Sequence, residues 1–192
     1  ERLLSAEGDL SVRGTDLDGI FIGLWLNREH KDMLASFDGF YTYFAATGFS
    51  YGSTPSKWHE LSSWAMANGK LFIASVGPGY DDTRIRPWNS HNTRDRANGQ
   101  YYEAFWTHAI EEGANIVSVT SYNEWGEGTQ IETAAMASER DIYKRYSDPY
   151  QYLNLTAKMA SEFRRRRAEV LSGGEGSEHD AATTARQIQD EL

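Results

Sequence analysis

Two glutamates stand three residues apart in the stretch SYNEWGEGTQIE, residues 121–132, and they are the first candidates for chemistry. Glu124 and Glu127 follow an apolar, β-branched run, and the glycines at 126 and 128 indicate that the strand ends there and the backbone turns. In a turn this spacing directs both side chains to one side, whereas a continuing strand would separate them. The motif therefore brings two like charges together.

Neighbouring carboxylates repel each other, so such a pair can divide into an acid and a base. Hydrolysis of a glycosidic bond requires that division, because one carboxyl group protonates the leaving oxygen while the other acts on the opposite side of the sugar. Trp125, between the two glutamates, would add a flat wall for a sugar ring. The spacing alone still favours two solvated loop acids, because acidic pairs are common on protein surfaces.

A long polar and aromatic loop, SVGPGYDDTRIRPWNSHNTR at residues 75–94, is the second candidate. Its arginine and asparagine donors, combined with tyrosine and tryptophan faces, suit a ligand rich in hydroxyl groups. Its aromatic content argues against disorder, although a structural loop held by Arg–Asp pairs explains the composition equally well. In FDGFYTYF, Tyr41 and Tyr43 lie on one side of a predicted strand and could reach a ligand, while core packing is favoured for each tyrosine taken singly.

Composition excludes several classes of function. The chain has 192 residues and a net charge of −9, which argues against nucleic-acid binding. It has no cysteine, its five histidines show no metal-binding spacing, and it contains no GxSxG motif, so thiolate, zinc and serine-hydrolase chemistry are unsupported. No apolar run approaches the ~20 residues of a membrane span.

The elements that must position these residues alternate along the chain. Strands are predicted at residues 18–26, 37–44, 70–76 and 115–125, and helical segments at 30–36, 55–68, about 101–112 and about 149–170. This order predicts parallel βαβ units, which fit either half of an eightfold barrel or a small doubly wound sheet. Polar loops after strands two, three and four favour the barrel. Residues 1–170 are expected to form this domain, and residues 171–192 a disordered tail.

Three segments carry a resemblance to a known family: FDGFYTYFA, FIASVGPGYDDTRIRPWNSHNTRDRANGQYYE and VSVTSYNEWGEGTQIE. Together they resemble the family 99 glycoside hydrolases, and within them the eukaryotic endo-α-1,2-mannosidases, over residues 15–165. The resemblance implies an α/β fold, a (β/α)8 (TIM) barrel of which this chain holds the last four βα units. It also implies removal of glucosylated mannose from N-linked high-mannose glycans, with retention of configuration and without a metal or cofactor. The sugar's own 2-hydroxyl displaces the leaving group and gives a 1,2-anhydro sugar.

Carried over to this chain, the family roles make Glu124 the base at the 2-hydroxyl and Glu127 the acid and base at the glycosidic oxygen. One residue departs from the family pattern, which usually has histidine where this chain has Gly126. The implied substrate contacts are Tyr41, Tyr43, Tyr80, Arg86, Trp88, Asn89, Asn92, Asn123 and Trp125.

A half-barrel would leave sheet edges and apolar surface open, so the chain is expected to be a fragment, inactive and poorly soluble alone. The resemblance implies the Golgi lumen and an N-terminal membrane anchor, which this chain lacks. The C-terminal QDEL resembles a lumenal retrieval signal read by a receptor, which would indicate the endoplasmic reticulum lumen, and a chance acidic ending explains it equally well. Two other functions stay open: a lectin-like relative without turnover, and a glycosidase of a related barrel with another glycan specificity.

Overall fold

The computed structural model describes residues 2–134 and 146–189, with side chains described through residue 172. Contacts divide the chain into one unit that ends at Leu155 and a second that begins at Thr156, and each is described by itself. No described helix is long and apolar enough to cross a membrane. The first unit contains the sheet and every candidate site residue.

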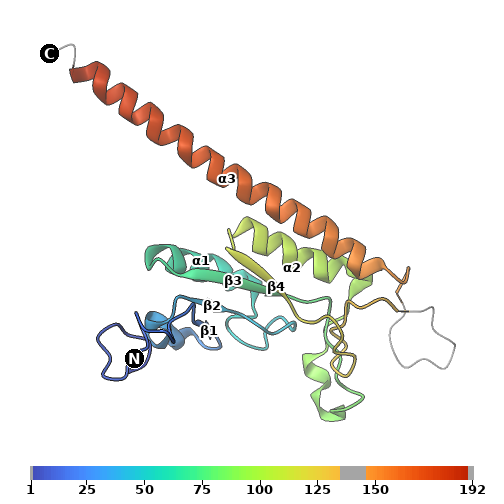
Figure 1. Ribbon diagram of the computed structural model, residues 1–192. Helices are drawn as coiled ribbons and strands as arrows, with labels where there is room; N and C mark the ends of the chain where they lie inside the picture. Colours follow the sequence, from blue (N-terminus) through green and yellow to red (C-terminus); the bar gives the residue numbers. More distant parts are fainter. Residues whose placement is uncertain (1, 135–145, 190–192) are drawn as a thin grey trace. The chain divides into compact units, whose positions relative to one another are not determined.

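The first unit is built on four parallel strands in the order β1-β2-β3-β4 (Figure 1). The strands are β1 (Ile22–Leu24), β2 (Gly39–Tyr41), β3 (Leu71–Val76) and β4 (Ile116–Val119). Neighbours pair in register, with Phe40 opposite Phe72 and Ala74 opposite Val117. The predicted parallel βαβ order is therefore confirmed, and the structure shows an α/β fold with a four-stranded parallel sheet.

The strands are shorter than the sequence predicts, most clearly at the second strand. The aromatic alternation predicted residues 37–44, but β2 ends at Tyr41 because Tyr43 adopts a positive φ of 55°. Its backbone N–H donates to Ser75 Oγ at 2.7 Å, and its carbonyl accepts from Thr120 Oγ1 at 2.6 Å. Hydroxyl groups from or beyond two other strands thus hold this residue out of the extended conformation.

Two helices cover the same face of the sheet (Figure 1). They are α1 (Trp58–Ala67) and α2 (Gln100–Glu111), each entered through a short 3-10 turn, Pro55–Lys57 and Ala97–Gly99. Further 3-10 helices lie at Arg28–Lys31, Met33–Ser36 and Pro87–Asn92. Their placement between strands confirms the predicted alternation of helical segments and strands.

Aromatic rings fill the layer between these helices and the sheet. Trp58 of α1 lies between Phe72 of β3 and Phe105 of α2, with ring centroids 6.1 Å and 5.6 Å away. The apolar residues Trp58, Leu61 and Met66 recur at roughly helical spacing, which favours one common face, but Met66 is 82% exposed and Ala65 is buried instead. Ala65 follows Trp58 by seven residues, which is close to two full helical turns, so the two side chains point in almost the same direction. Met66 follows Trp58 by eight residues and therefore points away from the buried face.

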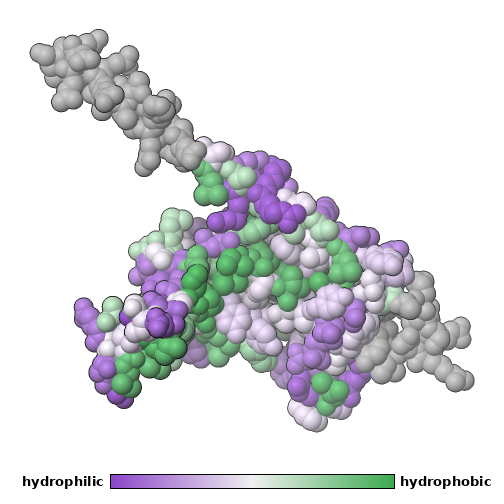
Figure 2. Space-filling model, in the orientation of Figure 1, coloured by the Kyte–Doolittle hydropathy of each residue, from purple (hydrophilic) through white to green (hydrophobic). Residues whose placement is uncertain are grey.

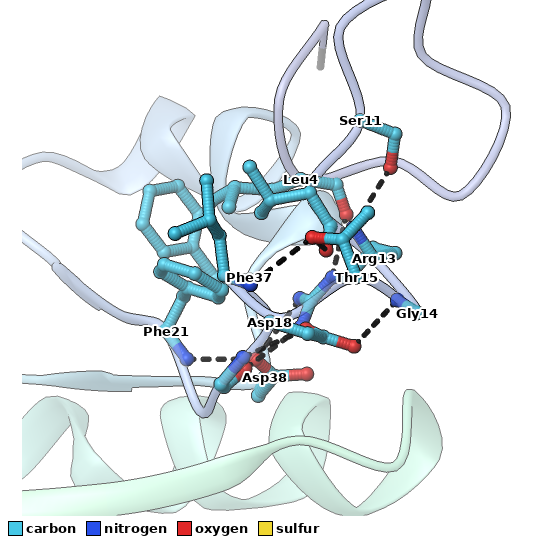
Figure 3. A network of polar contacts seen from close by, with 12 residues as sticks. Leu4, Ser11, Arg13, Gly14, Thr15, Asp18, Phe21, Phe37 and Asp38 are labelled. Carbon is cyan, nitrogen blue, oxygen red and sulfur yellow. Dashed lines mark hydrogen bonds and ion pairs between the residues drawn. The ribbon is translucent and has the colours of Figure 1, made fainter.

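An arginine fixes the irregular N-terminal segment to the sheet (Figure 3). Arg13 donates to the carbonyl of Leu4 and to the carboxylates of Asp18 and Asp38 at 2.9–3.1 Å, and its guanidinium lies over the Phe21 ring. Asp38 also accepts the Phe21 N–H at 2.7 Å, just before β2. The segment contains no helix or strand within residues 2–19, and the Arg13 side chain organises it.

The last helix, α3, runs from Gln151 to Gln189 and so continues beyond the predicted end near residue 170. The four arginines at 164–167 therefore lie inside α3, and Arg165 pairs with Glu162 and Glu169. Because the side chains beyond residue 172 lie outside the described part, the tail over 171–192 stays a prediction. Residues 190–192, most of the QDEL ending, are likewise outside the described residues.

Candidate active site

The candidate residues lie at the carboxyl ends of β2, β3 and β4, in the last residue of β2 or in the loops that follow the strands. Because the strands are parallel, these ends meet at one edge of the sheet, where α/β proteins bind ligands. Tyr80 and Arg94 pair their backbones across the base of the loop after β3, so the segment between them forms a compact excursion. Its 3-10 helix, Pro87–Asn92, carries Trp88 and Asn89.

Hydrogen bonds join this loop to the loop that carries the two glutamates. The Asp81 N–H donates to the Glu127 carbonyl at 2.8 Å, and Arg84 Nη2 donates to the Trp125 carbonyl at 2.5 Å. Gly128 has a φ of 62°, and an added Cβ there would lie 3.0 Å from the Asp81 carbonyl oxygen. The glycine therefore permits the close approach that brings the loops together.

The two glutamates share one turn but have different surroundings. Glu124 is exposed, and its Oε1 accepts the Gly126 N–H at 3.0 Å, so its carboxylate folds back on its own loop. Glu127 is 29% exposed, and its Oε1 accepts from Arg86 Nη1 at 3.0 Å. The two glutamates lie in a turn, as predicted, but β4 stops at Val119, before the predicted strand end at residue 125, and the carbonyl of Glu124 accepts the Thr129 N–H at 3.2 Å across the turn.

A buried carboxylate lies behind Glu127. The Asp82 side chain has no exposed surface, and its Oδ2 accepts hydrogen bonds from Tyr80 Oη, Arg86 Nη1 and Asn89 Nδ2 at 2.8–3.0 Å. Arg86 Nη1 therefore bridges Asp82 and Glu127, being 3.0 Å from each carboxylate. Tyr80, Arg86 and Asn89 therefore converge on Asp82 Oδ2, and Glu127 is connected to this group through Arg86.

Burial and hydrogen bonding shift the ionisation of this cluster in opposite directions. Burial by itself would raise the pKa of Asp82, but the hydrogen bonds from Asn89, Arg86 and Tyr80 outweigh it and hold the pKa below its ordinary value. Burial raises the pKa of the Tyr80 phenol, and its hydrogen bond to Asp82 and the nearby Glu127 charge raise it further. At neutral pH the cluster therefore combines a carboxylate, a neutral phenol and a guanidinium.

A cavity of about 350 Å³ opens beside this cluster. Its aromatic lining comes from Tyr43, Phe44 and Phe49, in the segment after β2, and from Trp88, in the loop after β3. Polar groups of Tyr80, Arg86, Asn89 and Glu127 complete the lining, with Ala46. Flat faces combined with a few convergent polar groups are typical of a small-ligand site. Among the described residues, no group of histidine, aspartate and glutamate is placed to hold a metal ion.

The structure brings some of the predicted contact residues to this cavity and leaves others outside it. Tyr43, Tyr80, Arg86, Trp88 and Asn89 line it together with Glu127.

The remaining predicted residues lie around the cavity without lining it. Tyr41 contacts the Tyr43 ring, Asn92 donates to Asn89, and Asn123 is exposed beside Glu124, which is itself outside the lining. Trp125 donates its indole N–H to Glu132 at 2.9 Å, so its ring is held by its own loop.

Sequence reasoning did not select three residues that matter here. Phe44 is the last residue of the strand predicted at 37–44, and Phe49 follows in a segment whose glycine, serine and proline content is typical of an ordinary loop. Asp82 was not separated from Asp81, since only the folded loop shows which of the two adjacent acids is buried.

Comparison with known proteins places these features in a family. Residues 1–165 match Glycosyl hydrolase family 99. The glycoprotein endo-alpha-1,2-mannosidase of Mus musculus is 48% identical over 170 residues, which cover 86% of this chain and 37% of the relative. The glycoprotein endo-alpha-1,2-mannosidase-like protein of Homo sapiens is 47% identical over 174 residues, which cover 88% of this chain and 38% of the relative.

A solved structure agrees with this sequence similarity. The GH99 endo-alpha-mannosidase from Bacteroides thetaiotaomicron, in complex with bis-tris propane, superposes with a TM-score of 0.82 at 50% identity. The match covers 87% of this chain and 54% of that one. The chain thus spans less than two-fifths of the two curated relatives' lengths and about half of the solved enzyme. By sequence and by fold, this chain belongs to glycosyl hydrolase family 99.

Proposed function

We propose that this chain carries the catalytic half of a retaining endo-α-1,2-mannosidase that removes glucosylated mannose from N-linked high-mannose glycans. The observation that carries the proposal is the glutamate pair on one turn at the carboxyl edge of a parallel sheet, with Glu127 lining a cavity of aromatic and polar side chains. The names of the curated relatives support the choice of bond and of glycan.

In the proposed reaction the two glutamates serve different oxygens. The sugar's 2-hydroxyl oxygen attacks C1 as the glycosidic C–O bond breaks, Glu124 takes the hydroxyl proton, and Glu127 gives its proton to the leaving oxygen. Water then attacks C1 of the 1,2-anhydro sugar, Glu127 takes a proton from this water, and Glu124 returns a proton to O2. Two inversions at C1 give net retention. The different surroundings of the two carboxylates support this division.

The cavity has the dimensions and chemistry for a sugar ring. Trp88 and Tyr43 offer flat faces, and Arg86 and Asn89 offer donors to hydroxyl groups. Trp88 is 78% exposed and Tyr43 is 42% exposed, so both rings are accessible to a ligand. Rings that are open to solvent and stand above fixed donors are suited to bind carbohydrate.

The finer fold and the activity of the isolated chain are part of the proposal. We propose that the four strands are half of a (β/α)8 barrel and that residues 1–192 alone do not turn over the glycan. Partial coverage of the solved relative supports this, as does exposed apolar surface near the first and last strands, including Ile20 at 75% and Ile116 at 46%. Apolar surface also runs across the region of the sheet in the space-filling view (Figure 2).

The cellular location is proposed from the family resemblance. The proposed substrate is on glycoproteins in the secretory pathway, so the Golgi lumen is the expected compartment, with the endoplasmic reticulum lumen as the alternative if QDEL is read by a retrieval receptor. Fusing the last residues to a secreted reporter tests the signal, and unchanged secretion rules retrieval out.

A completed domain tests the function. The chain is fused to, or co-expressed with, the part of the Bacteroides thetaiotaomicron enzyme that it does not match, and the product is assayed on a glucosylated high-mannose glycan. Release of glucosyl-mannose, lost in Glu124→Gln and in Glu127→Gln, is the expected result. An absence of release from the wild-type completed domain that still binds the glycan would refute hydrolysis.

One observation favours a second candidate, a lectin-like relative without turnover. The Glu124 carboxylate is held by the Gly126 N–H in its own turn rather than directed into the cavity. If that conformation persists with glycan bound, the site would bind without cleaving. Binding without release in the completed domain is the signature of this alternative.

A further inference from the structure

Asp82 is a charged residue to which the proposed reaction of Glu124 and Glu127 assigns no role. Its carboxylate is fully buried, yet it does not line the cavity. Burying a carboxylate is costly unless partners compensate, so a protein keeps one only where its contacts are strong. Its Oδ1 has no hydrogen-bond partner among the described side chains and backbone, so compensation comes through Oδ2.

The partners of Oδ2 are all cavity residues. Tyr80, Arg86 and Asn89 donate to this oxygen at 3.0, 3.0 and 2.8 Å, and each also lines the cavity. The Asp82 side chain, which does not line the cavity, therefore holds three side chains that do. Arg86 differs from the other two because the same nitrogen, Nη1, also donates to Glu127 at 3.0 Å.

Sharing one guanidinium between two carboxylates has an electrostatic consequence. Arg86 alone beside Glu127 would favour the ionised glutamate, which is the wrong form for donating a proton. The negative charge of Asp82, which accepts a hydrogen bond from the same nitrogen, opposes that effect while the hydrogen bond to Glu127 remains. The buried Asp82 carboxylate therefore offsets the charge of Arg86 and leaves the hydrogen bond from Arg86 to Glu127 in place.

We propose that Asp82 is a positioning residue: it holds Arg86 against Glu127 and neutralises the arginine so that Glu127 can carry the proton it delivers. The catalytic part of this inference rests on the proposed function of Glu127. The structural part, Arg86 fixed by Asp82, does not.

The charged and titratable groups around Glu127 come from two loops. Arg86, Tyr80 and Asp82 face it from the loop after β3, and Asp81 and Arg84 contact the backbone of its own loop from the same side. Glu124 shares its loop. Among the described residues, Arg86 is the cationic side chain that lies within salt-bridge distance of Glu127.

The variant Asp82→Asn isolates the charge. The amide oxygen can still accept from Tyr80 or Asn89, but Arg86 then bears an uncompensated charge beside Glu127. Asp81→Asn is the matched control, because Asp81 is the adjacent acid and its Oδ1 accepts from the Thr83 N–H and hydroxyl rather than from Arg86. Both variants are made in the completed domain and in the 192-residue chain.

The first readout is the pH–rate profile of the completed domain. With Asp82→Asn, the alkaline limb, where the acid loses its proton, should move to lower pH by about one unit, and kcat at neutral pH should fall about tenfold with little change in KM. Asp81→Asn should leave the profile in place. An unmoved limb, or a loss confined to KM, would overturn the proposal, since a merely structural or substrate-binding role predicts those results.

The second readout needs no turnover. In the NMR spectrum of the 192-residue chain, a guanidinium fixed by Asp82 should give resolved Nη signals for Arg86. In Asp82→Asn, where Arg86 keeps Glu127 but loses the charged Asp82, these signals should shift and broaden, and in Asp81→Asn they should stay unchanged. Unchanged signals in Asp82→Asn would overturn the structural part. If the wild-type completed domain is inactive while the signals behave as expected, the proposed function has failed and the anchoring of Arg86 stands.

Discussion

Replacing Arg96 by methionine should loosen the turn that carries the glutamates, because this arginine is anchored to its backbone. Arg96 is only 5% exposed, and its Nη2 donates to the carbonyls of Gly128 and Gln130 at 2.9 Å and 2.8 Å. The guanidinium also lies over the rings of Tyr152 and Tyr146, 4.6 Å and 5.3 Å from their centroids. Gly128 directly follows Glu127, so stability and site geometry are linked here.

The magnitude follows from these contacts. Hydrogen bonds from a charged group contribute about 1.5–3 kcal/mol each, and a cation–π contact about 0.5–2 kcal/mol. Two effects reduce the loss: methionine removes a buried charge, and the Tyr146 hydroxyl still donates to the Gln130 carbonyl at 3.0 Å. The Gly128 carbonyl then lacks its donor, and we expect a net destabilisation of about 2–4 kcal/mol. For a unit of this size that corresponds to a fall in melting temperature of roughly 4–16 °C.

Thermal unfolding followed by circular dichroism measures this change. The matched control is Arg28→Met in the same unit, because Arg28 is 70% exposed and pairs with the exposed Glu60 at 3.4 Å. Exposed pairs contribute little, so the control should melt within about 2 °C of the wild type. Equal melting temperatures for the two variants would refute the view that Arg96 anchors the turn.

Three further predictions concern the site and the N-terminal segment. In Gly126→Ala, the new Cβ would lie 2.8 Å from Glu124 Oε1, so the carboxylate should leave the backbone N–H with less than about 1 kcal/mol of destabilisation; a carboxyl carbon-13 signal of Glu124 that does not shift would contradict this. Because the folded pKa of Asp82 is lowered, its stabilisation is full above its unfolded value near about 4 and is lost as pH falls through the lower folded value. The wild type should therefore keep its full advantage over Asp82→Asn above about pH 4 and lose it progressively at lower pH in denaturant titrations, and a constant difference would be the contrary result. Arg13→Met should release residues 2–19 to limited proteolysis while the circular dichroism of the sheet and helices is kept, and unchanged protection of that segment would show that Asp38 and its other neighbours suffice.

Local patterns predicted the features that depend on neighbouring residues. Tyr102, Phe105, Trp106 and Ala109 repeat at helical spacing and form the buried face of α2, whose bounds, Gln100–Glu111, agree with the helix predicted at about 101–112. The parallel order of the strands also followed from alternation of strand and helix signals. The end of β2 could not be predicted, because the positive φ of Tyr43 depends on Ser75 and Thr120, which are distant in sequence.

The sequence predicted the two glutamates of the candidate site, but it did not predict which side chains contact them. The spacing of Glu124 and Glu127 indicated a shared turn, but it could not show that Arg86 contacts only the second of them. Of the adjacent acids Asp81 and Asp82, one caps its own loop and the other is buried, and composition does not distinguish them. Such differences arise from contacts between loops that come together only when the sheet forms.

The division of labour between Glu124 and Glu127 is the central claim, and the leaving group tests it most directly. A glucosylated mannoside carrying dinitrophenolate needs no proton from an acid when it leaves, so first-turnover release by the completed domain separates the two roles. Glu127→Gln should cleave the natural glycan at least about 100-fold more slowly yet release dinitrophenolate within about tenfold of the wild-type rate, while Glu124→Gln should be impaired on both substrates. Equal impairment of Glu127→Gln on both substrates would contradict the assignment.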